Sequence, residues 1–276
     1  MTQPIPSTPR RSAALLLTMA LAATLAGAGP GAAQVPSDAV LRGFQPIGDY
    51  VLAVGGKDVK AEIYQAEAVP AILVISSALT SPVLLLPRQG TVETVHIMKV
   101  AKQKDGSIDL LADAVLEPQG QFQAVGDDVS FTADGKQAQL KTKPPLLGAK
   151  SGAALRAYSP SYVRGAQTYK PNGQQIAALK KAAKPVKVRV FFGSWCPFCK
   201  QYLPYLLKVE EQLKGSKVQI EYFGLPRDLK NPEAQRLNVR GVPVGIVYVN
   251  GREVGRISGD GWKTPEATLA KIVARG

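Results

Sequence analysis

The sequence "GSWCPFCK" at residues 193–200 holds the only two cysteines of this 276-residue chain, Cys196 and Cys199. A disulfide across two intervening residues closes too small a loop to stabilise a fold much, so the pair is a poor structural cross-link. A zinc site needs about four ligands, and the sole histidine, His96, lies in the other half of the chain. We therefore expect a reactive thiol pair without metal or cofactor; the alternative is a metal shared with a second chain.

The residues around the pair predict that it opens a helix. "VKVRVFF" at 186–192 alternates as a strand does, and a helix is expected from Cys196 through residue 214. At the start of that helix the Cys196 sulfur would face free N–H groups and the positive end of the dipole, which favour the thiolate. Pro197 suits the first helical turn. Cys199 lies one turn further on the same face, within reach of a disulfide. We expect Cys196 to attack and the more buried Cys199 to resolve the mixed disulfide.

The elements that follow alternate between strands and helices. We expect a helix in 173–184, strands in 186–192 and 217–223, and a short helix in 232–238. A hairpin over 243–259 should turn at Asn250–Gly251, and a last helix over 264–276 should be capped by Thr264. This order predicts an α/β fold with a central mixed sheet and helices on both faces.

These residues resemble the thioredoxin superfamily over residues 172–276. "FFGSWCPFCKQYLP" is similar to the family's strand, W-C-x-x-C-K motif and helix, including a helix proline at Pro204. "RGVP" at 240–243 resembles the loop before the family's cis-proline, and "VNGREVGRISG" resembles its terminal hairpin. The resemblance implies a thiol-disulfide oxidoreductase in which Val242–Pro243 is a cis bond facing the cysteines. The backbone of Val242 would then bind an extended substrate peptide.

Side chains beside the cysteines complete the expected substrate site. Trp195, Pro197 and Phe198 would contact the substrate, although plain core packing is the alternative for Trp195. The pair Pro197–Phe198 resembles glutaredoxins and some envelope disulfide enzymes, in which the pair is more oxidising. Whether this protein oxidises, isomerises or reduces its substrates stays open at this point.

One position departs from the family pattern. Thioredoxins carry a buried aspartate six residues before the first cysteine, where it is thought to accept the proton of the second thiol. Here that position is Val190. By the family layout, Glu221 and Lys200 are the candidates to assist deprotonation of Cys199 instead, or water serves.

Residues 34–148 predict a different architecture. Short alternating segments are separated by turn signals every eight to twelve residues, which is typical of an all-β sandwich or barrel. The Asp-Gly pairs at 105–106 and 134–135 favour tight hairpins. His96 would be an ordinary strand histidine, with Thr94 and Met98 on its face. Prolines and glycines in 142–152 mark a boundary, so we expect domains at 34–148 and 172–276 joined by a linker at 149–171.

The first 33 residues have the pattern of a signal peptide. Arg10 and Arg11 precede an apolar run with many alanines, and small residues follow it, so cleavage is expected after Ala33. The alternative is a retained N-terminal anchor. A periplasmic location follows, with secretion as the second choice.

Charge is distributed unevenly along the chain. Residues 151–276 hold 21 Lys and Arg against 8 Asp and Glu, whereas residues 34–150 hold 11 against 13. The excess of Lys and Arg in residues 151–276 favours acidic partners, or it merely keeps the surface solvated. No nucleic-acid motif is present, so nucleic acid is not an expected partner. The expected partners are exported proteins with thiols or disulfides and a protein that recharges the pair, for which a membrane protein is one candidate.

Two other classes of function stay open. In one, the chain is an envelope binding or scaffold protein in which the cysteine pair is only a minor redox switch. In the other, the basic half is an adhesion or polymer-binding module, whose binding would be salt-sensitive and independent of the thiols.

Overall fold

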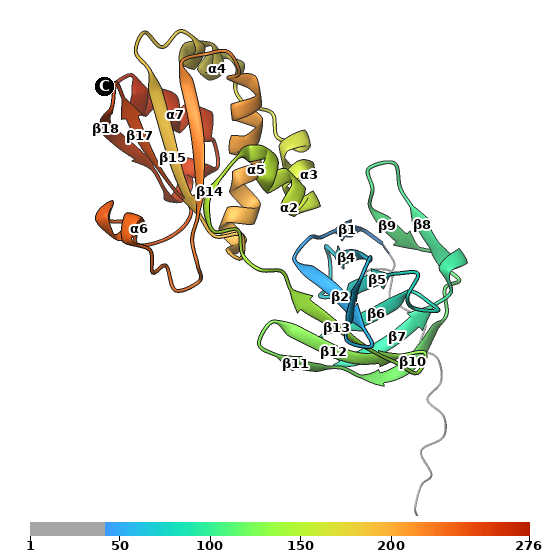
Figure 1. Cartoon of the computed structure of the whole chain (residues 1–276). Helices are drawn as coiled ribbons and strands as arrows, with labels where there is room; N and C mark the ends of the chain where they lie inside the picture. Colours follow the sequence, from blue (N-terminus) through green and yellow to red (C-terminus); the bar gives the residue numbers. More distant parts are fainter. Residues whose placement is uncertain (1–41) are drawn as a thin grey trace, which may run out of the picture. The chain divides into compact units, whose positions relative to one another are not determined.

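The computed structural model describes residues 42–276 (Figure 1). The predicted signal peptide at residues 1–33 lies outside these described residues. Within residues 42–276, no helix combines the length and the apolar character that crossing a membrane would need.

The N-terminal half is built from β-strands arranged in two sheets. One sheet has eight strands in the order β10-β7-β6-β5-β4-β1-β9-β8, and the other has five in the order β11-β12-β13-β2-β3. The strand bounds are β1 (Phe44–Pro46), β2 (Tyr50–Val54), β3 (Lys57–Val59), β4 (Glu62–Ala66), β5 (Ile72–Ile75), β6 (Val83–Leu86), β7 (Thr91–Val95), β8 (Val100–Lys102), β9 (Ile108–Leu110), β10 (Leu116–Gln121), β11 (Gln123–Val125), β12 (Asp128–Ala133) and β13 (Lys136–Thr142). The two large sheets of this half are partly consistent with the all-β sandwich or barrel expected for residues 34–148.

Strand β6 shows why this half folds as layers. All four of its residues are buried, since alternate side chains point to opposite faces of the sheet. Val83 and Leu85 pack in one core with Leu52 and Phe131 of the five-stranded sheet, while Leu84 contributes to a second core on the other face. Because both faces are covered, the segment is apolar throughout rather than alternating.

Two details of this half differ from the sequence prediction. His96 is not a strand residue: β7 ends at Val95, and His96 caps the short 3-10 helix η1 (Ile97–Lys99), with its Nδ1 accepting a hydrogen bond from the Met98 backbone N–H at 3.3 Å. The second difference concerns one of the two Asp-Gly turns. The Asp134–Gly135 turn is as predicted, with φ of 51° and 72°, as a tight primed hairpin requires. The turn between β8 and β9 is wider, and Gly106 alone has a positive φ there.

The C-terminal half contains a five-stranded mixed sheet in the order β14-β16-β15-β17-β18. The bounds of this half are β14 (Gly148–Lys150), α2 (Gly152–Tyr158), α3 (Pro160–Thr168), α4 (Gly173–Lys180), β15 (Val186–Phe192), α5 (Pro197–Gln212), β16 (Val218–Gly224), α6 (Pro232–Arg236), β17 (Val244–Val249), β18 (Arg252–Ile257), η2 (Gly259–Trp262) and α7 (Pro265–Val273). Central strand β15 pairs in parallel with β16 and antiparallel with β17.

Strand β15 has the two faces that its alternation predicts. Val186, Val188, Val190 and Phe192 enter a core with residues of α4, α5 and α7, whereas Phe191 packs on the opposite face with Ala234 of α6. Helices therefore cover both faces of the sheet, as expected. This arrangement leaves the end of β15 directly before the cysteine pair and the start of α5.

The segment expected as a linker, 149–171, contains two short helices and part of an edge strand. Strand β14 pairs antiparallel with β16, and α3 packs on α5. The approach of α3 to α5 is close, because a Cβ added at Gly165 would lie 2.6 Å from Pro204 Cβ. Thr264 precedes α7 but makes no capping hydrogen bond with its side chain, unlike the prediction.

Candidate active site

Cys196 is the N-cap residue of α5, and Pro197 occupies the first helical turn. The Cys196 Sγ accepts a hydrogen bond from the Cys199 backbone N–H at 3.4 Å and donates one to the Val242 carbonyl oxygen at 3.5 Å. A free N–H at the start of a helix lacks a partner within the helix, so a sulfur anion there satisfies it. The side chain is more enclosed than its expected role suggested, because Cys196 is only 4% exposed.

Electrostatics make Cys196 the acidic thiol of the pair. A hydrogen bond from the Cys199 side chain is the largest effect that lowers the pKa of Cys196, which falls to about 6 from an ordinary value of 9.0. Burial opposes this shift, while the backbone N–H groups of Cys199 and Phe198 and the charge of Lys200 support it. At neutral pH a thiol with this pKa is mostly thiolate, the nucleophilic form.

Cys199 has the opposite environment. It is fully buried, and burial raises its pKa well above the ordinary value, with the neighbouring Cys196 side chain as a further cause. Its Sγ accepts a hydrogen bond from the Gly193 backbone N–H at 3.4 Å, which acts in the other direction. Both cysteines are free thiols in the structure. The two thiols are both buried but differ in acidity, as an attacking and a resolving cysteine require.

An apolar groove lies beside Cys196. Its volume is about 270 Å³, and it is lined by Phe198, Tyr202, Val242, Pro243, Gly259, Asp260 and Trp262. The Val242–Pro243 peptide bond is cis, and the Val242 carbonyl contacts the Cys196 sulfur. Phe198 is 62% exposed, so its ring offers apolar surface beside the groove. The structure brings four of the predicted site residues, Cys196, Phe198, Val242 and Pro243, to one place.

Trp195 lies on another side of the pair. Its indole Nε1 donates a hydrogen bond to the Leu225 carbonyl at 2.9 Å, and the ring packs against the core. The guanidinium of Arg227 lies 5.9 Å from the ring centroid, within the range of a cation–π contact. Trp195 therefore both packs, as the alternative reading held, and presents part of its ring to a pocket.

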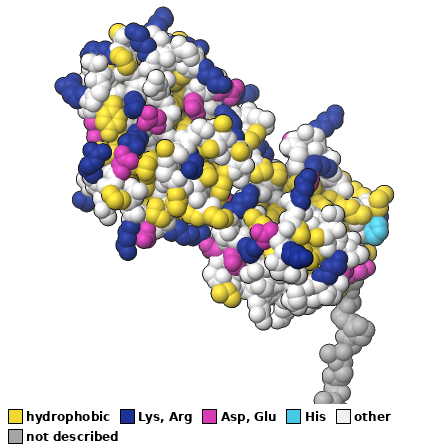
Figure 2. All heavy atoms as spheres, in the orientation of Figure 1, with side chains coloured by type: hydrophobic (Ala, Val, Ile, Leu, Met, Phe, Trp, Pro, Cys, Tyr) yellow, Lys and Arg dark blue, Asp and Glu magenta, His cyan; other side chains and the backbone are white. Residues whose placement is uncertain are grey.

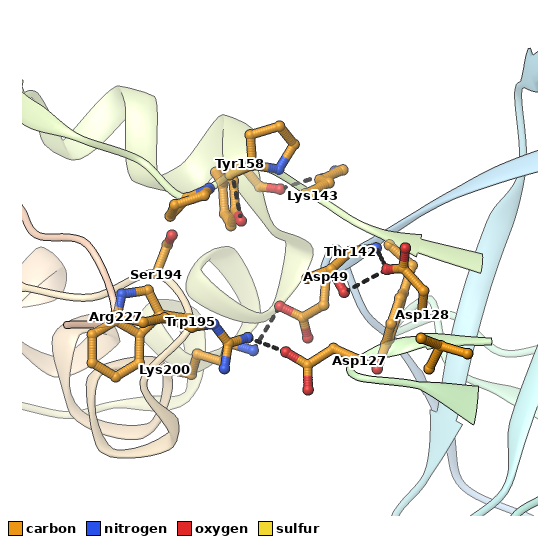
Figure 3. Close-up of a pocket in the computed structure, with 14 residues that line it drawn as sticks. Asp49, Asp127, Asp128, Thr142, Lys143, Tyr158, Ser194, Trp195, Lys200 and Arg227 are labelled. Carbon is orange, nitrogen blue, oxygen red and sulfur yellow. Dashed lines mark hydrogen bonds and ion pairs between the residues drawn. The ribbon is translucent and has the colours of Figure 1, made fainter.

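That pocket is polar and has a volume of about 630 Å³ (Figure 3). Trp195 and Ser194 line it together with charged side chains that form ion pairs. Lys200 Nζ lies 2.7 Å from Asp49 Oδ1, and Arg227 pairs with Asp127. Lys200, a predicted helper of Cys199, is thus held by a carboxylate while its charge acts on Cys196.

The second predicted helper is not at the site. Glu221 forms an ion pair with Lys187 at 2.8 Å on an exposed part of the sheet. Its neighbour in β16, Tyr222, enters the core that contains the cysteines, so Glu221 points to the other face. Val190 is completely buried, and it provides no ionisable group near Cys199.

Sequence reasoning missed Tyr162. This residue of α3 is fully buried in the core that contains both cysteines, and its hydroxyl has no hydrogen-bond partner among the described residues. The only sequence signal was a tyrosine in a segment of mixed polarity, which does not reveal that α3 packs on α5.

The C-terminal part of the chain is similar to thioredoxins. The family model described as Thioredoxin matches residues 172–275. Thioredoxin Y of Oryza sativa subsp. japonica, a chloroplastic protein, is 28% identical over 135 residues, which are 47% of this chain and 76% of that protein. Thioredoxin-2 of Saccharomyces cerevisiae is 34% identical over 83 residues, which are 30% of this chain and 75% of that protein. Mitochondrial thioredoxin-2 of Schizosaccharomyces pombe is 31% identical over 90 residues, which are 33% of this chain and 65% of that protein.

The matched residues contain the cysteine pair, the helix that it caps and the cis-proline loop. On these grounds the chain belongs to the thioredoxin family, through a thioredoxin domain in its C-terminal part.

Proposed function

We propose that this protein is a thiol-disulfide oxidoreductase that exchanges disulfides with exported client proteins. One observation carries the proposal: Cys196 caps α5 with a pKa of about 6, beside Cys199, whose pKa is raised by burial. Family membership supports the reaction class, and the signal-like first 33 residues support export.

The reaction proceeds in two exchanges. The Cys196 thiolate attacks one sulfur of a client disulfide, so that a Cys196–client bond forms and the client S–S bond breaks. The released client sulfur takes up a proton. Cys199 then loses its proton and attacks Cys196, which forms the Cys196–Cys199 disulfide and releases the second client thiol. The client gains two electrons from the cysteine pair and two protons, one from Cys199 and one from water; the reverse sequence oxidises a client.

The groove beside Cys196 provides the binding site for the client chain. Phe198 offers exposed apolar surface to a client side chain, and the Val242 backbone lies next to the reacting sulfur. Backbone contacts with an extended peptide are independent of sequence, so this geometry suits a protein that serves several clients. Pro197 is exposed beside Phe198, whereas Trp195 presents its ring to the polar pocket on another side of the pair.

An insulin-reduction assay with dithiothreitol tests the enzymatic reading. We expect the parent to accelerate insulin precipitation and Cys196→Ala to abolish the acceleration, because the nucleophile is lost. In a separate reaction without dithiothreitol, pre-reduced Cys199→Ala should accumulate a mixed disulfide with insulin, which non-reducing electrophoresis detects. Equal acceleration by the parent and Cys196→Ala would leave the scaffold reading, in which the pair is only a minor switch.

Export is tested separately. A fusion of residues 1–41 to alkaline phosphatase lacking its own signal should be active in a Gram-negative host, since that enzyme needs the disulfides that form outside the cytoplasm. Replacing Arg10 and Arg11 by Glu should reduce that activity. An inactive parent fusion would contradict the proposed periplasmic location.

A further inference from the structure

The resolving step places a demand on Cys199 that the described contacts do not fully meet. Cys199 is completely buried, and burial raises its pKa, yet it must become a thiolate to attack the mixed disulfide. In the free protein its sulfur accepts a hydrogen bond from the Gly193 backbone N–H. A thiolate has room for more than one donor, and a buried anion is stabilised mainly by donors already in place.

Tyr162 carries an unused donor in the same core. Its side chain is fully buried with Cys196, Cys199 and Leu203, and its hydroxyl is without a hydrogen-bond partner among residues 42–276. A buried hydroxyl without a partner is costly, and native proteins rarely retain one without a reason. Buried tyrosine Tyr222 shows the usual arrangement, because its hydroxyl bonds to Glu210 Oε2 at 3.0 Å.

The packing of α3 on α5 brings Tyr162 into the core that holds the resolving cysteine. Gly165 lets α3 approach α5 at Pro204, one turn of α3 beyond Tyr162 and five residues of α5 beyond Cys199. Burial raises the pKa of Tyr162, and the neighbouring Cys199 side chain is the next largest cause. The hydroxyl therefore keeps its proton at any physiological pH and can act only as a neutral donor near that sulfur.

We propose that Tyr162 is a further catalytic residue, whose hydroxyl donates a hydrogen bond to the Cys199 thiolate during resolution. The inference rests on the proposed disulfide exchange. Tyr162 keeps its proton throughout. The Cys199 proton passes to the departing client sulfur or to water, the Cys199–Cys196 bond forms, and the Cys196–client bond breaks. Ionisation makes the Cys199 sulfur a stronger acceptor, and in this proposal the free Tyr162 hydroxyl then pairs with it.

The variant Tyr162→Phe removes the hydroxyl and leaves the ring. In a single-turnover reaction with a disulfide-containing peptide, we expect the mixed disulfide to resolve about tenfold more slowly, because a hydrogen bond to a charged group is lost. The first step, attack by Cys196, should keep its rate. The matched control is Tyr222→Phe, which removes a buried hydroxyl that bonds to Glu210; it should leave the resolution rate unchanged.

A second readout does not depend on turnover. In a Cys196→Ala background, the rate of Cys199 alkylation against pH should shift to higher pH when Tyr162 becomes Phe. Besides Cys196 and Cys199, the charged or titratable groups that act on Tyr162 are Tyr158 and Asp49, and both are retained in these variants. This titration separates the inference from the proposed function, since it gives a result even if the parent reduces no client.

Two results would overturn the inference. One is a Tyr162→Phe protein whose resolution rate and Cys199 titration match those of the parent. The other is equal slowing of attack and resolution together with a lower melting temperature, which would assign Tyr162 to packing alone. We expect the melting temperature of Tyr162→Phe to equal or exceed that of the parent, since the unpaired hydroxyl is gone.

Discussion

At the residue scale, the site depends on a difference between two identical side chains. Cys196 caps a helix and has three sources of stabilisation for its anion, namely the Cys199 side chain, backbone N–H groups and the charge of Lys200. Cys199 lies one turn deeper in the core, where burial opposes ionisation. The same thiol chemistry therefore gives a nucleophile at one position and a protected resolving group at the other.

Phe198 provides a prediction for client binding. Phe198→Ala should raise KM for an unfolded disulfide-containing client about fivefold, because truncating a contact residue typically costs about 1 kcal/mol of binding free energy. The Cys196 titration should not move. Val115→Ala, which truncates another exposed apolar residue in the N-terminal half, is the matched control and should leave KM unchanged. A KM for Phe198→Ala within the error of the parent would remove Phe198 from the client site.

The residues of the site differ in how far the sequence reveals them. Cys196 and Pro197 are readable because a helix start is a local feature with local signals. Glu221 was misplaced because a family layout does not say to which face of its strand a side chain points. Tyr162 gave no signal, since its role depends on a contact between α3 and α5 that the chain order does not disclose.

At the element scale, the close contact between α3 and α5 fixes where Tyr162 lies. Gly165 sits opposite Pro204, where even one methyl group would be 2.6 Å from a ring carbon. The elements around this contact differ in how clearly the sequence predicts them. Strand β15 and helix α5 follow from clear periodicity. Helices α2 and α3 are short, and Gly165 inside α3 weakens its helical pattern. Strand β14 has three residues and shows no alternation to detect.

Gly165→Ala provides a prediction for this contact. A methyl group in a helix interior usually gains about 0.5–1 kcal/mol over glycine, but overpacking against Pro204 should cost about 1–3 kcal/mol, so we expect net destabilisation. The control Gly173→Ala, at the start of α4 with nothing within 4 Å of the added Cβ, should be neutral or slightly stabilising. Urea unfolding of both variants measures the difference. A Gly165→Ala protein as stable as Gly173→Ala would mean that α3 and α5 are not in close contact.

At the scale of the whole molecule, charge is divided unevenly between the two halves of the chain. The segment 151–276 carries the excess of 21 Lys and Arg over 8 Asp and Glu. Figure 2 shows these side chains scattered over the visible surface of the C-terminal half rather than gathered in one patch. Scattered charge of one sign acts mainly on the rate of encounter with charged clients.

This distribution predicts a salt-dependent preference among clients. Two disulfide-containing peptides that differ only in flanking Glu or Lys residues should react at different rates, with the acidic peptide about tenfold faster at about 10 mM salt. Raising the salt to about 0.5 M should bring the two rates together, because screening shortens the range of the interaction. Stopped-flow measurement of kcat/KM checks this. A preference that persists in high salt would point to specific contacts instead.

The most direct test of the account is the titration of Cys196. The rate of Cys196 alkylation by iodoacetamide is measured by mass spectrometry from about pH 4 to about pH 10, a range that includes both the lowered and the ordinary pKa of a cysteine. In the reduced parent this rate should rise with a midpoint near pH 6. In Cys199→Ala the midpoint should move upward, toward the ordinary value of 9.0, because the largest cause of the lowered pKa is removed. A parent midpoint near 9 would contradict the claim that the start of α5 makes this sulfur a nucleophile.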